Sequence, residues 1–502
     1  MSTLSPTQSG TTERRRWVAL IVVCLAMLMN ALDGSIVNVA LPSIQRDLHF
    51  APSSLTWVVD AYLIAFGSFL MLAGRLGDLL GRKKVFLGGV GLFTAASAAC
   101  ALATSQGWLI AARFVQGVGG AVSTSVIVAI IVTEFAGAAE RAKAMSAYMF
   151  VAVGGGSLGL LVGGILTQSV SWHWIFLINV PIGITTLVLG SMLIRENEGL
   201  GVRHGLDITG SLLLTGSLLL GIFGVVKAST YGWLSLHTSV ALGLSLALFG
   251  GFLTVESRVA RPIVPLRIFR LRSLSASSVV RGLTFAAMYA VFFFGALYLE
   301  RVLGFRPLAT GLAFLPMSLV MAAMSLGATS RLLLRFGAMR LLVPGLSGVV
   351  AGLALLTRTG LHSSYVTSVL PAFVLLGVGM SISAVPLLTI AMADVPREDA
   401  GLASGIVNVS MWLASSTALA VMGTLAASTS ASHLAHGSGV NAAAVAGYHV
   451  PFAIGAVLAA AGLLVTVTLL RSPAQRETLA TFASTRILDD APAEQLVLDE
   501  WS

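Results

Sequence analysis

The feature that most constrains this chain is a series of long apolar segments that recurs from residue 17 to residue 470. Each run is about 20 residues long, the length that a helix needs to cross the hydrocarbon core of a bilayer. The mean hydropathy is +0.91 and only 10% of the residues are charged, a composition far too apolar for a soluble protein. Alternating strands of the transmembrane β-barrel type do not appear in the sequence. The sequence therefore predicts an all-α integral membrane protein.

Fourteen transmembrane helices are predicted from these runs. They cover residues 17–41, 55–74, 85–103, 108–132, 144–166, 172–194, 208–226, 237–255, 274–298, 308–330, 341–357, 364–392, 402–427 and 450–470. Because the number is even, both termini are expected on the same side of the membrane. The first run follows a basic cluster, as a secretory signal does, but it is too long for one and no small-residue cleavage site ends it.

The basic residues indicate which side the termini occupy. Most of the 30 Lys and Arg residues lie in connections on the side of the termini. Four are expected on the opposite side, Arg46, Arg301, Arg306 and Arg358, and three fall within spans, Arg113, Lys227 and Arg281. Positive charge accumulates in cytoplasmic loops, so both termini are predicted to be cytoplasmic. The net charge of +9 then reflects topology, and no nucleic-acid partner is expected.

The chain is predicted to divide into two six-helix halves, because a segment at 74–84, GRLGDLLGRKK, has a weaker echo at 330–340, SRLLLRFGAMR. The predicted parts are a cytoplasmic segment at 1–16, a first half at 17–200, a two-helix insert at 201–256, a basic cytoplasmic linker at 257–273, a second half at 274–471 and a cytoplasmic tail at 472–502. The linker is expected to lie along the inner membrane surface. The small and polar segment 428–449 is predicted to be a flexible external loop.

Three charged side chains are predicted in the outer layer of the first half. At 1.5 Å per residue, Asp33 lies about 12 Å and Asp60 about 8 Å from the outer ends of their spans, and Arg113 lies near the outer end of span four. A charge at this depth is costly if it faces lipid, so these side chains are expected to point into a bundle or a watered cavity. They are candidates for proton coupling or substrate binding. A structural Asp–Arg pair remains the alternative for Asp33, and simple hydration remains the alternative for Asp60.

Other polar and aromatic side chains are candidates for lining a pathway. Asn30 and Asp33 are three residues apart and share a helix face, but asparagines serve equally as hydrogen bonds between helices. Aromatic rings suit an adaptable apolar pocket, although rings of this kind also face lipid. The candidate lining residues are Asn30, Asn38, Trp57, Tyr62, Phe66, Gln116, Phe292 and Trp412.

A stripe of glycines marks span five. The sequence GGGSLGLLVGG places Gly155, Gly159 and Gly163 four residues apart, which permits close approach of a neighbouring helix. Together with Gly164, the stripe suits a hinge where two half-bundles rock against each other. Close packing without any hinge is the simpler interpretation.

The segment 74–84 is a candidate cytoplasmic gate. Glycines that include Gly74 and Gly81 predict a tight turn, and Asp78 and Arg82 are four residues apart, so a charge network could latch two helices. An ordinary positive-inside loop is the alternative.

The sequence contains no phosphate-binding G-x-x-x-x-G-K-[ST] segment, and no Cys/His cluster has metal-ligand spacing. Energy for transport is therefore expected from an ion gradient, from the substrate's own gradient or from a partner. We expect no enzymatic activity, no metal site and no cofactor other than a proton gradient.

These motifs resemble the fourteen-span drug:proton antiporters of the major facilitator superfamily. The segment LDGSIVNVALPSI at 32–44 is similar to a first-span signature, GRLGDLLGRKK to the loop motif after span two, and RFVQGVGGA at 113–121 to a fourth-span motif. Further similar segments are WHWIFLINVPIG at 172–183, LDITG at 206–210 and GLASGIVN at 401–408. The resemblance covers nearly the whole chain.

The resemblance implies roles for individual residues. Asp33 would be the acidic first-span residue, Arg113 the proton-coupling arginine, and Asp78 with Arg82 the cytoplasmic gate. The glycine stripe would be the antiporter motif of span five. The sequence departs from the family at Leu160, where a proline normally follows the glycine, and at His173, where an arginine usually separates two tryptophans.

The function implied is export of lipophilic drugs or antibiotics by alternating access in exchange for protons, by a monomer in the bacterial cytoplasmic membrane. The proton and the drug would exclude each other at one carboxylate. Two alternatives remain open: a proton-coupled importer of a small solute, and a non-transporting membrane sensor or lipid-binding protein. Substrate identity and proton stoichiometry are not defined by the sequence.

Overall fold

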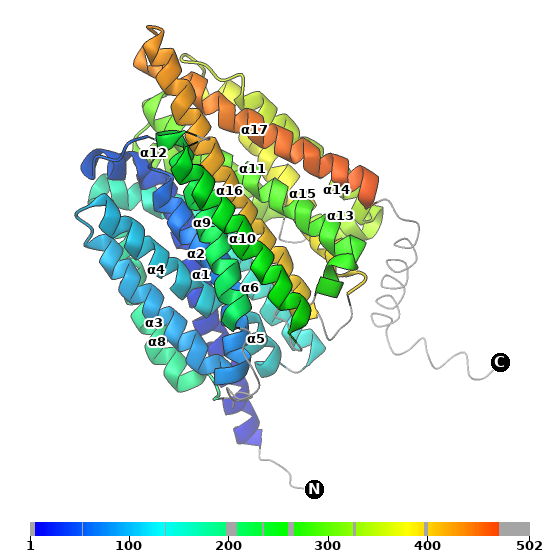
Figure 1. Ribbon diagram of the computed structural model, residues 1–502. Helices are drawn as coiled ribbons and strands as arrows, with labels where there is room; N and C mark the ends of the chain where they lie inside the picture. Colours follow the sequence, from blue (N-terminus) through cyan, green and yellow to red (C-terminus); the bar gives the residue numbers. More distant parts are fainter. Residues whose placement is uncertain are drawn as a thin grey trace, which may run out of the picture.

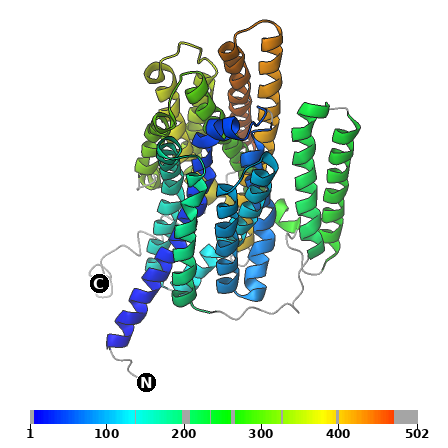
Figure 2. The same cartoon turned by 90° about the vertical axis from the view of Figure 1, so that its left-hand side faces the viewer.

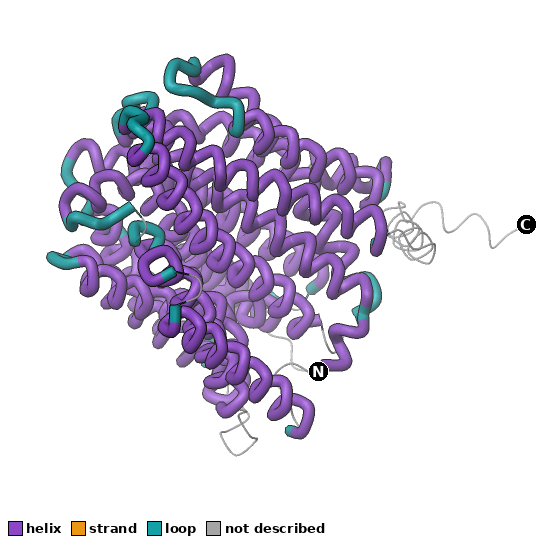
Figure 3. The backbone as a smooth tube through the Cα atoms, turned by 45° about the horizontal axis from the view of Figure 1, so that its top comes forward, coloured by secondary structure: helices purple, strands orange, loops and turns teal. Residues whose placement is uncertain are grey.

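The computed structural model describes residues 6–470, except 53, 136, 197–207, 233–234, 260–265, 325–327 and 396–399. Within these residues the chain is built from helices and their connections, with no strand (Figure 3). The predicted tail at 472–502, residues 1–5 of the N-terminal segment and residues 260–265 of the linker lie outside the described residues.

The first group of helices precedes residue 194. Its members are α1 (Pro6–Asp47), α2 (Trp57–Leu80), α3 (Arg82–Ala101), α4 (Gln106–Ser125), α5 (Ile127–Glu134), α6 (Ala138–Ser169), α7 (Trp174–Leu177) and α8 (Asn179–Leu193). Two helices follow, α9 (Ile208–Tyr231) and α10 (Leu236–Arg258). The last group is η2 (Leu266–Arg270), α11 (Arg272–Arg301), α12 (Pro307–Ala323), α13 (Thr329–Phe336), α14 (Ala338–Leu356), η4 (Tyr365–Val369), α15 (Leu370–Met392), α16 (Ala400–Ala435) and α17 (Val440–Leu469).

The helices run along one another in a single bundle with a side pair (Figures 1 and 2). Helix α1 begins at the bottom of Figure 1, which we call the termini end, while α16 and α17 join at the opposite, distal end. The pair α9–α10 stands at the flank of the bundle in Figure 2, and α9 contacts α2 and α16. The two larger groups meet mainly through α6 with α12 and through α2 with α16.

Eleven helical spans in the described residues are long and apolar enough to cross a membrane. Three shorter apolar helices, within α2, α9 and α12, accompany them. The structure thus has the all-helical membrane architecture that the apolar runs predict, while the count of fourteen transmembrane helices stays a prediction.

The prediction of a flexible external loop at 428–449 is wrong. Helix α16 continues to Ala435 and α17 begins at Val440, so only four residues connect them. The two helices cross so closely that a Cβ at Gly447 would overlap the Ser430 hydroxyl and lie 2.7 Å from the Ala426 carbonyl oxygen. Residues 428–449 include several alanines, and alanine has the highest helix propensity of all residues. Helix propensity and the close packing of α16 on α17 together stabilise helix in a segment whose polar residues predict a loop.

The segment 74–84 contains one sharp turn, and it is at Gly81. Gly74 lies inside α2, so its expected place in a tight turn is not observed. Gly81 has φ 97°, a conformation that favours glycine, and it separates α2 from α3. Gly337 occupies the same place in the echo segment, between α13 and α14, with φ 80°. The two halves therefore share this turn.

The glycine stripe of α6 packs against α1. A Cβ at Gly155 would lie 2.7 Å from the Cβ of Ala31, and one at Gly163 would lie 2.8 Å from the Ile36 carbonyl oxygen. Gly164 faces the other group, because its Cβ would lie 2.6 Å from the Pro307 carbonyl oxygen of α12. Helix α6 is therefore wedged between α1 and α12, and it runs unbroken through Leu160, whose backbone keeps the amide that proline would lack.

We predict that Gly159→Ala lowers the unfolding temperature of the purified protein, because its Cβ would lie 2.8 Å from the Leu32 carbonyl oxygen. Overpacking of this kind costs about 1–3 kcal/mol. The matched control is Gly156→Ala on the same helix, where no heavy atom lies within 4 Å of the added Cβ. That variant should unfold at the wild-type temperature or slightly above it, since alanine favours helix. Equal effects of the two substitutions would contradict the packing described.

Candidate functional site

The central feature of the first group is a buried ion pair between α1 and α4. Asp33 and Arg113 have side chains that are 0% and 1% exposed, and Arg113 Nη1 donates to Asp33 Oδ2. The carboxylate does not face the lipid, as its position in an apolar helix led us to expect. Each charge compensates the other at a depth where a single charge is expensive.

Hydrogen bonds from two more helices complete the surroundings of Asp33. Its Oδ1 accepts from Gln116 Nε2 at 2.8 Å and from Asn179 Nδ2 at 3.3 Å. Both amides also donate to Ser97 Oγ, each at 3.1 Å, and Ser97 Oγ donates to the Phe176 carbonyl at 2.8 Å. A single carboxylate thus connects α1, α3, α4 and α8 through one polar network.

Arg113 has contacts that hold its guanidinium in one orientation. Its Nε donates to the Val58 carbonyl of α2 at 2.9 Å, and its Nη1 donates to Gln116 Oε1 at 2.8 Å. The guanidinium carbon lies 4.4 Å from the centre of the Tyr62 ring and 5.6 Å from that of Phe176. Stacking on aromatic faces and bonding in a planar fork are properties of arginine that lysine lacks.

Asp60 is equally buried but differently surrounded. Its side chain is 0% exposed, and neither carboxylate oxygen has a hydrogen-bond partner among the described residues. The hydroxyl groups of Thr56 and Ser416 lie beside it and are the polar side chains next to the carboxylate. Ser416 belongs to α16, so Asp60 lies where the first helical group meets the second.

The candidate lining residues separate into distinct groups. Tyr62 and Gln116 join the Asp33–Arg113 network. Phe66 lies 4.7 Å from Trp412 between ring centres, a contact from α2 to α16 across the two groups. Trp57 instead packs on Phe223 of α9, with 6.2 Å between ring centres.

The two asparagines of α1 act within and between helices. Asn30 Nδ2 donates to the hydroxyl groups of Ser123 at 3.3 Å and Thr124 at 3.2 Å, and so ties α1 to α4. Asn38 Nδ2 donates to the Ser35 carbonyl of its own helix at 3.1 Å. The alternative interpretation of Asn30, a hydrogen bond between helices, is therefore what the structure contains.

In the candidate gate, Arg82 reaches from the turn at Gly81 to α5. Its Nη1 donates to the Ala129 carbonyl at 3.2 Å and to the Thr133 hydroxyl. The side chain of Asp78 lies outside the described residues, so its expected partnership with Arg82 stays a prediction.

Ser97 and Asn179 are site residues that sequence reasoning missed. Asn179 stands inside WHWIFLINVPIG, a segment that the resemblance marks, so a signal existed for it. A serine in an alanine-rich helix carries no such signal. Only the packing of α3 against α4 and of α3 against α8 brings Ser97 to the two amides that hold the carboxylate.

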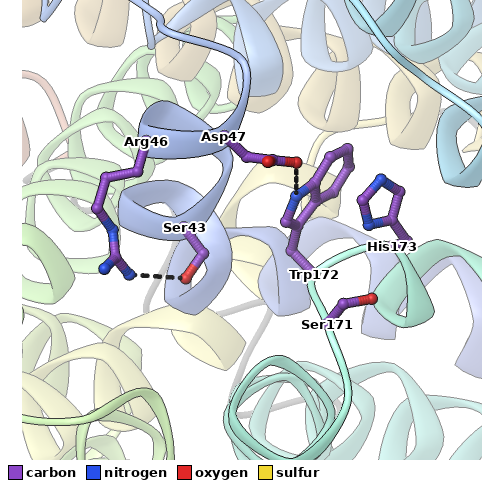
Figure 4. Close-up of a pocket in the computed structure, with 6 residues that line it drawn as sticks. All are labelled: Ser43, Arg46, Asp47, Ser171, Trp172 and His173. Carbon is purple, nitrogen blue, oxygen red and sulfur yellow. Dashed lines mark hydrogen bonds between the residues drawn. The ribbon is translucent and has the colours of Figure 1, made fainter.

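Two cavities open at the distal end. One, of about 410 Å³, lies where α1 ends, and there Asp47 Oδ2 accepts from Trp172 Nε1 at 2.8 Å (Figure 4). His173 stacks on Trp172 with 3.7 Å between ring centres. Burial lowers the pKa of His173, and the charge of Asp47 opposes that shift. The other cavity, of about 700 Å³, lies between the ends of α1 and α11 and the start of α12.

The described residues include no group of His, Cys, Asp and Glu side chains that could hold a metal ion. Two groups of apolar helices around buried charges have the architecture of a secondary transporter. A model of the Major Facilitator Superfamily matches residues 23–420. The chain belongs to this superfamily of membrane transporters and is not an enzyme.

Its relatives include transporters named for antibiotics. The puromycin resistance protein pur8 of Streptomyces alboniger is 36% identical, over 92% of this chain and 93% of that protein. The cephamycin export protein CmcT of Amycolatopsis lactamdurans is 35% identical, over 82% of this chain and 85% of that protein. The tetracenomycin C resistance and export protein of Streptomyces glaucescens is 32% identical, over 82% and 76%.

Solved structures share the fold at low sequence identity. A POT family transporter has a TM-score of 0.65 at 16% identity and covers 91% of this chain and 99% of its own. A D-xylose–proton symporter has a TM-score of 0.62 at 15% identity, over 90% and 97%. At this identity the likeness supports the fold alone.

We predict that Arg113→Gln destabilises the protein by about 3–5 kcal/mol, because it leaves the Asp33 carboxylate buried without its counter-charge. The double variant with Asp33→Asn should recover most of this loss, since it removes both charges. Thermal unfolding of the wild type, the two single variants and the double variant measures the coupling. Strictly additive effects would show that the pair does not interact.

Proposed function

We propose that this protein exports amphipathic drugs or antibiotics across the bacterial cytoplasmic membrane in exchange for protons. The relatives named for puromycin, cephamycin and tetracenomycin C support an antibiotic as the substrate. The proton gradient is the proposed driving force, and both termini are proposed to be cytoplasmic, as the distribution of basic residues predicts.

The observation that carries the proposal is the buried network around Asp33. Its carboxylate, on α1, bonds side chains of α4 and α8, and these connect to α3 through Ser97, so a change in its partners changes how the four helices are held together. When a proton binds, the carboxylate loses the charge that holds Arg113, and when substrate displaces the proton, the pair forms again. The proton and the substrate therefore exclude each other, which couples the inward flow of one to the outward flow of the other.

The contacts between the two helical groups support alternating access. Gln168 Oε1 of α6 accepts from the backbone amide of Leu308 of α12 at 3.2 Å, next to the close approach of Gly164 to Pro307. At the same end, Gly423 of α16 packs against Thr56. These contacts lie toward the distal end, the proposed external side. We propose that they separate when the transporter opens outward.

Asp60 is the proposed second acid of the cycle. It lies at the junction of the two groups, one helix turn from Thr56 and beside Ser416. It has only the hydroxyl groups of Thr56 and Ser416 beside it, whereas Asp33 must release Gln116, Asn179 or Arg113 when a proton arrives. Rocking of the two groups would also change the surroundings of Asp60 directly.

We predict that Asp33→Asn abolishes drug resistance in a host stripped of efflux pumps, because an amide cannot exchange a proton with the substrate. The panel should contain puromycin, a cephamycin, tetracenomycin C and lincomycin. The matched control is Asp47→Asn on the same helix, where an amide oxygen can still accept the bond from Trp172. Unchanged resistance in an Asp33→Asn variant that is present in the membrane would remove Asp33 from the mechanism.

A second prediction concerns proton release. Adding an exported drug to the purified wild type in weakly buffered solution should release protons, measured with a pH indicator. Asp33→Asn and Asp60→Asn should each reduce the number released per bound drug. If the wild type binds drug without releasing any proton, exchange at these acids is excluded.

Direction of transport separates this proposal from import. Everted membrane vesicles that are acidified inside should accumulate an exported drug, and an uncoupler should abolish the accumulation. Drug leaving such vesicles under the same gradient would identify an importer.

A further inference from the structure

Helix α11 carries an arginine within the membrane region that the proposed cycle does not use. Arg281 lies nine residues after the start of α11 at Arg272, hence about 13 Å from that end at 1.5 Å per residue. Its Nε is buried, and the side chain has no hydrogen bond or ion pair within the described residues. Its guanidinium carbon lies 5.0 Å from the centre of the Phe285 ring.

Four partly exposed side chains of α11 form one stripe, separate from the exposed face that carries Arg272 and Val279. Between residues 280 and 299, only five side chains are partly exposed, and the rest are buried: Arg281, Leu283, Phe285, Tyr289 and Phe292. All but Leu283 recur at intervals of three or four residues, which places them on one helix face. Arg281 is thus the charged end of an otherwise aromatic stripe.

The middle of the stripe faces the first helical group. Helix α1 packs against α11, and Tyr289 lies near enough to Arg113 and Asp60 for their charges to act on its hydroxyl group. Helices α15, α16 and α17 pack on other sides of α11, and Val279 is exposed on the side opposite the stripe. Partial exposure of the stripe itself indicates accessible space between the two groups, where a transported molecule would pass.

We propose that Arg281 binds an acidic group, a carboxylate or a phosphate, on the transported amphiphile. An arginine inside the membrane is costly without a counter-charge, and here the ligand would supply that charge through two parallel hydrogen bonds. The rings of Phe285, Tyr289 and Phe292 would hold the apolar part of the ligand. This inference rests on the proposed export function and names the chemical class of its substrate.

Basic side chains at the distal end of α11 would also favour an acidic substrate. Three of the four basic residues predicted on the external side, Arg46, Arg301 and Arg306, line the cavity of about 700 Å³ there. Only one acidic side chain, Glu300, lines that cavity. An acidic substrate moving along α11 from Arg281 would therefore leave through a positively charged opening.

The test compares two dyes that differ by one acidic group: rhodamine B, which has a free carboxylate, and its ethyl ester. Binding to purified protein is measured by fluorescence polarisation in a maltoside detergent, which carries no acidic group that could compete. The wild type should bind the acid more tightly than the ester. Arg281→Gln should weaken binding of the acid at least tenfold and leave binding of the ester unchanged, while Arg281→Lys should restore part of the preference.

The matched control is Arg272→Gln, which removes the same charge from an exposed position of the same helix and should change neither affinity. Equal loss of both dyes in Arg281→Gln, no loss of either, or a wild type that does not prefer the acid would overturn the inference. Proton-driven export of the ester separates the two proposals. If the wild type and Arg281→Gln both export the ester but show no preference for the acid, the assignment to Arg281 fails while the proposed antiport stands.

Discussion

The charge of Asp33 is the constraint on which the rest of the structure depends. A carboxylate inside the membrane region needs a counter-charge and hydrogen-bond donors, and α4 supplies both through Arg113 and Gln116. Because Asn179 and Ser97 complete the network, α3 and α8 must lie where their side chains reach it. The orientation of Arg113 is also fixed, because it donates a hydrogen bond to the Val58 carbonyl of α2 and stacks on the Tyr62 ring. The first helical group is therefore arranged around one acid.

The two buried acids differ in what a movement of the helices would do to them. Asp33 lies wholly within the first group, and its partners move with it. Asp60 faces Ser416 on the second group, so rocking of the two groups changes its surroundings. The close contacts of α6 with α12 and of α2 with α16 concentrate toward the distal end, which leaves the face of α11 with Tyr289 and Arg281 accessible between the groups. The proposed proton exchange at Asp60 and the proposed movement of the two groups would therefore occur at the same junction.

Much of this could be predicted from the sequence, for identifiable reasons. Apolar runs of spanning length predict helices, and an aspartate within such a run predicts its own burial, because lipid cannot solvate the charge. Residues that act only through packing could not be predicted. Ser97 bonds the two amides that donate to Asp33, because α3 lies beside α4 and α8. Gly447, which has no side chain, lets α17 pack closely against Ser430 of α16. The proposed role of Arg281 in substrate binding likewise depends on packing, because the neighbouring helices determine which side chains of α11 are accessible.

Infrared difference spectroscopy of the purified protein, recorded with and without an exported drug, can show whether Asp33 changes its protonation when the drug binds. The account predicts that drug binding removes a protonated-carboxyl band, that Asp33→Asn lacks this component of the difference, and that Asp47→Asn keeps it. A spectrum in which the drug binds and the carboxyl region of the wild type and of Asp33→Asn change identically would contradict exchange of proton and drug at Asp33.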